Sequence, residues 1–183
     1  MKYGLILLMT ISAMLVFSTT VYASESAKDN TITDNAIAVM KDTKGNTVGL
    51  ATFTEDASGL VRINLDVSGL TPGLHGIHIH EKGDCVKPSF TSAGGHYNPL
   101  SKEHGLNNPK GPHAGDLPNL EVGKDGKGHM NVTTKLVTLS PGPTTLFTAN
   151  GTSLIIHAGP DDQMTNPAGN SGARIVCGVI EKK

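Results

Sequence analysis

The sequence has few aromatic residues and little sulfur. It contains no Trp, three Tyr and four Phe, so a row of aromatic side chains that stacks on nucleic-acid bases is not expected. Only two cysteines occur, Cys85 and Cys177, which are too few for a zinc site made of cysteine alone. The 15 basic and 16 acidic residues nearly balance, which argues against nucleic acid or an anionic membrane as the main partner.

Charge is also absent from a long stretch near the N-terminus. Residues 4–23 are uncharged, follow a single Lys and end in Val-Tyr-Ala, a layout typical of a secretory signal peptide. We therefore expect a signal peptide over 1–23, a polar tether over 24–35 and one folded domain over 36–183. The stretch could also span a bilayer, so an uncleaved membrane anchor is the alternative. Either reading places the protein in the periplasm, at the cell surface or outside the cell, where two cysteines are typical of a disulfide.

Short segments in which apolar and polar residues alternate recur after residue 35. Within 60–67, for example, Val61, Ile63 and Leu65 fall on one side and Arg62 and Asn64 on the other, as in a strand with one buried face. No helical periodicity of useful length follows the leader. The pattern predicts an all-β sandwich or barrel of about eight strands, at 36–40, 48–53, 60–67, 75–81, 120–122, 129–134, 153–156 and 173–180.

Histidines with spacings suited to metal binding lie on two predicted strands and in the long loop between them. His78 and His80 are two residues apart in a predicted strand, so both side chains leave the same face. His157 ends another apolar run. Between them lies a long Gly- and Pro-rich loop over 83–119, and a loop of this length in a compact domain is usually functional. The loop carries three histidines and an acid that match the ligand composition of a structural zinc site, His96, His104, His113 and Asp116.

The number of ligands indicates that two metals share one of them. Six of these residues are histidines and one is an acid, whereas two four-coordinate metals need eight donor positions. An imidazole can supply the missing position, because its two ring nitrogens can each bind a metal. The set therefore points to a pair of metals bridged by one histidine.

Four segments resemble, in the same order, signature segments of the copper,zinc superoxide dismutase family in its bacterial exported form. They are residues 73–81 (GLHGIHIHE), 92–99 (SAGGHYNP), 113–117 (HAGDL) and 169–180 (GNSGARIVCGVI). The resemblance covers about residues 36–180. It implies an eight-stranded antiparallel Greek-key barrel with a long metal-binding loop. It also implies an oxidoreductase that converts superoxide to dioxygen and hydrogen peroxide, protecting the cell envelope or exterior.

The resemblance also implies a role for each matching residue. One redox-cycling copper per subunit would bind His78, His80, His96 and His157, and one structural zinc would bind His96, His104, His113 and Asp116. His96 would be both bridge and proton carrier, and Arg174 would attract superoxide. Asp161 would orient ligands of both metals. Cys85 and Cys177 would join the metal loop to the last strand, whereas His75 would be buried without binding metal.

Two features depart from the eukaryotic members of the family, and the first of them affects substrate guidance. The stretch from Asp162 to Arg174 is shorter than the charged loop of eukaryotic relatives and has no Lys. Cys85 lies 11 residues before His96, as in bacterial forms. No metal ligand is missing. The alternative function is a catalytically silent metal buffer or structural β-sandwich. Superoxide is the expected partner, with no nucleic acid, no membrane beyond the N-terminal anchor, and either a monomer or a homodimer.

Overall fold

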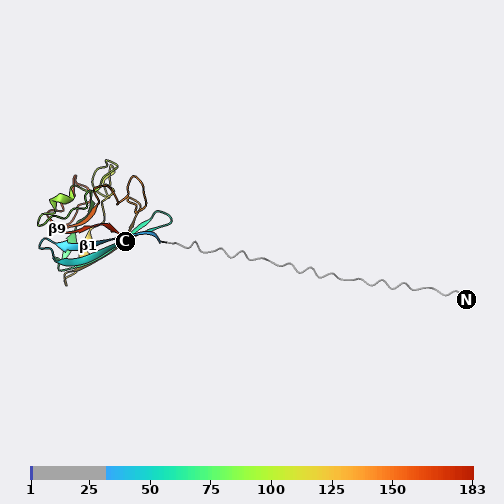
Figure 1. The fold of residues 1–183 in the computed structure, drawn as a ribbon, viewed down its shortest axis with the longest axis horizontal. Coiled ribbons are helices and arrows are strands. Elements are labelled where there is room, and N and C mark those ends of the chain that lie inside the picture. Colours follow the sequence, from blue (N-terminus) through green and yellow to red (C-terminus); the bar gives the residue numbers. More distant parts are fainter. Residues whose placement is uncertain (2–31) are drawn as a thin grey trace.

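A computed structural model describes Met1 and residues 32–183 (Figure 1). The predicted signal peptide and most of the predicted tether lie outside the described residues. No helix in the described part is both long and apolar enough to cross a membrane. Within residues 32–183 the regular elements are ten strands and one short 3-10 helix: β1 (Ile32–Asp42), β2 (Thr47–Asp56), β3 (Val61–Ser68), β4 (Gly73–His75), β5 (Ile77–His80), η1 (Thr91–Ala93), β6 (Leu120–Val122), β7 (Lys127–Thr134), β8 (Ser153–His157), β9 (Arg174–Val179) and β10 (Glu181–Lys182).

The strands form one antiparallel sheet that curls into a nearly closed barrel. Its order is β4-β6-β7-β3-β2-β1-β9-β8-β5, and β10 pairs with β1. The two end strands, β4 and β5, are consecutive in the chain and are separated by Gly76 alone. The predicted all-β barrel is therefore confirmed. Neighbours that are distant in sequence, such as β3 with β7 and β1 with β9, bring the C-terminal half against the N-terminal half.

Alternating side chains fill the interior of the barrel. In β3 the residues Val61, Ile63 and Leu65 are fully buried, as their spacing predicted. Ile63 lies opposite Phe53 of β2 on one side and Val132 of β7 on the other. Because neighbouring strands in register present the same face, these rows meet inside the barrel and bury apolar surface from water.

The strand predicted over 75–81 is in fact two short strands that turn a corner at Gly76. β4 pairs with β6, whereas β5 pairs with β8 at the other end of the sheet order. Gly76 donates its N–H to Gly159 O (2.8 Å), and its carbonyl accepts the N–H of His157 (2.8 Å). A Cβ atom at Gly76 would lie only 2.7 Å from the Cβ of Ser171. The prediction was wrong here because the corner depends on hydrogen bonds with His157 and Gly159, which lie 81 and 83 residues further along the chain.

Other strand bounds also differ from the prediction. β1 runs from residue 32 to 42, beyond the predicted 36–40, because it pairs along almost its whole length with β2. The last strand pair, between β10 and β1, involves only two residues of β10 and was not predicted. These differences raise the strand count to ten in the described part without changing the fold class.

The loop over 83–119 folds back along β5 and is tied to β9. Ile79 in β5 donates its N–H to Gly115 O and accepts the N–H of Tyr97, both at 2.8 Å. The disulfide between Cys85 and Cys177 joins the start of the loop to β9 across 92 residues, which confirms the predicted bond. The loop is therefore held along β5 and at its N-terminal end, close to the histidines.

Candidate metal centre

Four histidines from β5, from β8 and from the loop over 83–119 converge at one place in the structure. His78 and His80 lie on β5, His157 ends the adjacent strand β8, and His96 forms a backbone bridge with His80. All four are buried, with at most 8% of their surface exposed. One nitrogen of each lies within 4.8 Å of the others. The strand pairing of β5 with β8, together with the folding of the loop onto β5, therefore gathers the set.

The nitrogens that face one another lack hydrogen-bond partners. Among the residues that the structure describes, only four buried side-chain nitrogen or oxygen atoms have none: His78 Nδ1, His80 Nε2, His96 Nε2 and His157 Nε2. Buried polar atoms are almost always paired, and a concentration of unpaired ones requires an explanation. A metal ion bound to all four nitrogens would explain why they are unpaired, so these residues fit a metal site.

The opposite ring nitrogens of this set are hydrogen-bonded. His80 Nδ1 donates to Gly94 O and His157 Nδ1 donates to Gly172 O, each at 3.0 Å. These bonds place the proton on the outward nitrogen and leave the inward lone pair free for a metal. Burial is the main cause that lowers the pKa of His78 to about 3, of His80 to about 2 and of His157 to about 4. The imidazoles are therefore neutral at pH 7, as metal ligation requires.

A second set surrounds one oxygen of Asp116. The Nδ1 atoms of His96, His104 and His113 lie 3.0, 3.1 and 3.4 Å from Asp116 Oδ1. Bonds of about 2.0–2.1 Å to a tetrahedral zinc ion place neighbouring ligand atoms about 3.3 Å apart, so these spacings fit such an ion. The other oxygen, Oδ2, accepts the N–H groups of Gly105 (2.8 Å) and His113 (2.9 Å), which fixes the carboxylate.

His96 belongs to both sets. Its Nε2 is one of the four unpaired nitrogens, and its Nδ1 faces Asp116 in the second set. Burial lowers the pKa of His96, so its ring also enters this site without a charge. The structure thus brings together all seven residues that the sequence analysis proposed, and the geometry provides the shared imidazole that the ligand number suggested.

Comparison with known proteins agrees with this centre. The sequence model of the family described as copper/zinc superoxide dismutase (SODC) matches residues 47–180. The chain belongs to this family. Membership implies an oxidoreductase with copper and zinc as cofactors, and it confirms the predicted resemblance.

Relatives within the family are similar over most of the chain. "Superoxide dismutase [Cu-Zn] 2" of Aquifex aeolicus is 48% identical, over 79% of this chain and 85% of the relative. The enzyme named "Superoxide dismutase [Cu-Zn]" of Caulobacter vibrioides is 43% identical, over 80% and 86%. The crystal structure of a superoxide dismutase-like protein from Bacillus subtilis superposes with a TM-score of 0.75, at 46% identity and with coverage of 78% and 96%.

Asp161 connects the two ligand sets of this family member. Its Oδ2 lies 2.7 Å from His78 Nε2 and its Oδ1 lies 3.0 Å from His104 Nε2. Burial raises the pKa of Asp161, but the hydrogen bonds with both histidines outweigh it and bring that pKa below its ordinary value. Burial likewise lowers the pKa of His104, and the bonds to Asp116 and Asp161 overcome it and raise the pKa to about 9.

Asn119 holds Asp161 in turn, and the sequence analysis missed it. The Asn119 side chain accepts the N–H of Asp161 and donates to its carbonyl, both at 2.8 Å. An asparagine between a proline and a strand is common in loops, so the sequence carries no signal for this contact. Only the folded chain, which places residues 42 positions apart side by side, reveals it.

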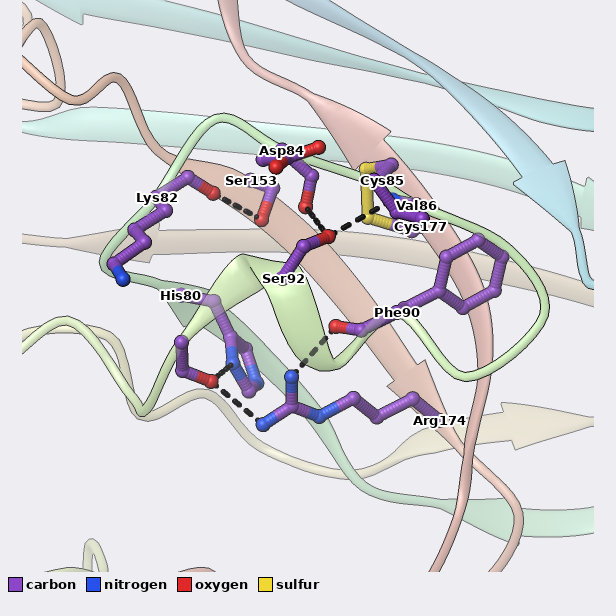
Figure 2. Close-up of a disulfide and its surroundings, with 11 residues drawn as sticks. His80, Lys82, Asp84, Cys85, Val86, Phe90, Ser92, Ser153, Arg174 and Cys177 are labelled. Atoms are coloured by element: carbon purple, nitrogen blue, oxygen red, sulfur yellow. Dashed lines mark hydrogen bonds between the residues drawn. A yellow bond between two sulfur atoms is a disulfide. The ribbon is translucent and has the colours of Figure 1, made fainter.

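Arg174 begins β9 directly opposite His157 in the strand register. Figure 2 shows its guanidinium group beside His80 and below the disulfide. It donates to Phe90 O and to Gly94 O, each at 2.6 Å, and the same Gly94 carbonyl accepts His80 Nδ1. The loop that the disulfide fixes therefore also positions this half-buried cation, and the two carbonyl acceptors were not evident from sequence.

Two further histidines lie outside both ligand sets. His75 is buried in β4, where Nδ1 lies 2.7 Å from His157 O and Nε2 lies 2.8 Å from Thr71 O. His129 is exposed on β7 and contacts Asp66 across the strand pair at 2.8 Å. The resemblance assigned no ligand role to His75, and both of its ring nitrogens contact backbone carbonyls.

Proposed function

We propose that this protein dismutes superoxide, converting two superoxide anions and two protons into dioxygen and hydrogen peroxide. The observation that carries the proposal is the pair of adjacent ligand sets that share His96. Four unpaired imidazole nitrogens suit a copper ion, and three imidazoles with one carboxylate suit a closed zinc site. The names of its relatives from Aquifex and Caulobacter support the same reaction.

In this proposal His78, His80, His96 and His157 hold one copper, and His96, His104, His113 and Asp116 hold one zinc. Copper bound there would supply the one-electron oxidation and reduction that dismutation needs, since zinc has no accessible redox change. The protein contributes a rigid set of neutral ligands. Asp161 keeps one ligand of each set in orientation through its two oxygens.

Arg174 and His96 would act on the substrate and the proton. The guanidinium of Arg174 is always charged, and its place opposite His157 puts a cation beside the four-histidine set, where it attracts the superoxide anion. His96 has one nitrogen in each set, so its Nε2 can hold a proton while Nδ1 stays with the other ligands. A proton at that atom lies where the product peroxide needs one.

The site of action in this proposal is the cell envelope or exterior. The disulfide supports it, because such bonds persist mainly in oxidising compartments. The charge-free stretch over 4–23 is the expected export signal.

The test is superoxide dismutase activity of the protein as secreted, loaded with copper and zinc. A zinc-only sample, His96→Ala and the surface control His129→Ala complete the set. We expect fast turnover that requires copper, is lost in His96→Ala and is unchanged in His129→Ala. Tight binding of both metals without turnover would contradict the proposal and favour a metal-holding protein.

A further inference from the structure

One peptide group connects a metal-site histidine, the cationic side chain and an acid outside both ligand sets. This is the peptide between Gly94 and Gly95. Its carbonyl, on Gly94, accepts hydrogen bonds from His80 Nδ1 (3.0 Å) and Arg174 Nη2 (2.6 Å). Its N–H, on Gly95, donates to Oε1 of Glu81 at 3.0 Å. The orientation of this single planar group therefore sets the acceptor for two functional side chains at once.

The peptide lies in a part of the chain that has little conformational restraint of its own. Two consecutive glycines flank it, and glycine has more accessible backbone conformations than any other residue. Gly94 adopts φ 74° and ψ −155°, a conformation that other residues rarely adopt. Something outside the two glycines must hold the peptide in place.

Glu81 provides that restraint from the residue after His80. Its side chain covers Gly94 so closely that a Cβ atom there would lie 2.6 Å from Glu81 Cγ. Its own N–H donates to Gly95 O at 3.0 Å, while its carboxylate accepts the N–H of Gly95. Glu81 is thus hydrogen-bonded to both backbone groups of Gly95, as donor through its own N–H and as acceptor through its carboxylate.

We propose that Glu81 is a positioning residue, whose carboxylate fixes the 94–95 peptide and through it the Arg174 guanidinium and the His80 ring. The proposal rests on the role proposed above for Arg174 at the copper site. A charged acceptor makes a stronger hydrogen bond than a neutral one, and it polarises the peptide so that the carbonyl at the other end becomes a better acceptor. Both effects strengthen the bonds to Arg174 and His80.

The positioning role predicts the opposite effect on the rate from the one that the charge of Glu81 alone would have. Glu81 is an exposed negative charge near a site for an anion. If it acted only through its field, its removal would leave the rate unchanged or raise it. If it positions Arg174, removal of its acceptor oxygen lowers the rate, even though the substrate is repelled less.

Three variants separate these effects: Glu81→Ala, Glu81→Gln and Glu121→Ala. Each removes one negative charge, but only Glu81→Gln keeps an acceptor oxygen at residue 81. Glu121, exposed on β6, is the charge control because it contacts neither ligand set. Copper and zinc content and the disulfide are checked first, so that only equally loaded samples are compared.

The first readouts are kcat/KM for superoxide and the affinity of the copper site for azide, a small anion that reports on Arg174 without turnover. We expect both to be about three- to tenfold lower in Glu81→Ala than in Glu81→Gln, the equivalent of about one hydrogen bond. Glu121→Ala should match or exceed the wild-type protein, whereas Glu81→Gln should fall between Glu81→Ala and this charge control, because its neutral oxygen accepts a weaker hydrogen bond than the carboxylate does. Equal values for the Ala and Gln variants at residue 81 would overturn the proposal.

A second readout needs neither turnover nor copper. In the zinc-loaded, copper-free protein the amide proton of Gly95 should exchange with solvent several-fold faster in Glu81→Ala than in Glu81→Gln, because its acceptor is gone. Unchanged exchange would also overturn the proposal. If the wild-type protein shows no dismutase activity, the function proposed above fails, while the azide and exchange measurements still decide the role of Glu81.

Discussion

Acidification of the metal-free protein should remove much of its stability. His78, His80 and His157 are buried and neutral, with pKa values lowered by burial from 6.5 to about 3, 2 and 4. In the unfolded chain the same groups bind protons near pH 6.5. The unfolded state therefore takes up more protons as the pH falls below 6.5, and the native state is destabilised. Stability is present above the unfolded pKa and is lost on the acid side.

The magnitude follows from proton linkage. At pH 5 each of the three histidines favours the unfolded chain by about 2 kcal/mol, and together by about 6 kcal/mol. Because all three folded-state values lie below 5, only the unfolded pKa matters at that pH. His104 partly offsets this loss of stability on acidification, because its pKa is raised to about 9 in the folded protein. The stability that its protonated ring contributes is complete below pH 6.5 and is lost as the pH rises through 9. A net loss near 5 kcal/mol is a large part of the about 5–15 kcal/mol typical of a folded domain.

The assay is urea unfolding of the metal-free protein with its disulfide intact, at pH 7 and pH 5, followed by circular dichroism. His80→Gln, which cannot bind a proton, should reduce the acid loss by about 2 kcal/mol. The exposed His129→Gln is the control and should not change it. A metal-free protein that is equally stable at both pH values would refute the reasoning, because it would show that the histidines are not buried in neutral form.

Three other changes have defined outcomes. Arg174→Lys replaces a guanidinium that donates to two carbonyls with a single ammonium group, so kcat/KM measured by stopped flow should fall about tenfold. Its dependence on ionic strength should stay close to that of the wild-type protein, because the positive charge is kept. Cys85→Ser opens a 92-residue loop and should lower the free energy of unfolding by about 2–5 kcal/mol in urea titrations. Asn119→Ala leaves the Asp161 backbone without two partners, so zinc affinity measured by competition with a chelator should fall about tenfold or more, while a wild-type affinity would exclude this support role.

Much of the fold and the ligand set could be predicted from local sequence. Strand periodicity is a property of neighbouring residues, so the alternation in β3 predicted which side chains are buried. The paired positions of His78 and His80 likewise follow from strand geometry alone. The loop residues and His157 were candidate ligands from residue type and position, and the resemblance to a known family added their assignment to copper or zinc. The family match agrees with that resemblance.

What could not be predicted depends on groups that carry no sequence signal. The corner at Gly76 depends on backbone hydrogen bonds with His157 and Gly159, and the support of Asp161 depends on Asn119. The acceptors for Arg174 are backbone carbonyls, which every residue has. Side-chain chemistry can be read from a sequence, whereas the position of a particular peptide group depends on the complete tertiary structure.

The loop over 83–119 has a consequence beyond ligand supply. A sheet that ends in an uncovered strand offers free N–H and C=O groups to which another molecule can add a strand. In this barrel β5 is such an end strand, and the loop occupies its outer edge through the bonds of Ile79 to Gly115 and Tyr97. The segment that carries all four residues of the second ligand set therefore also covers the edge of β5, so the same loop gathers these residues and occupies the groups to which another strand could add.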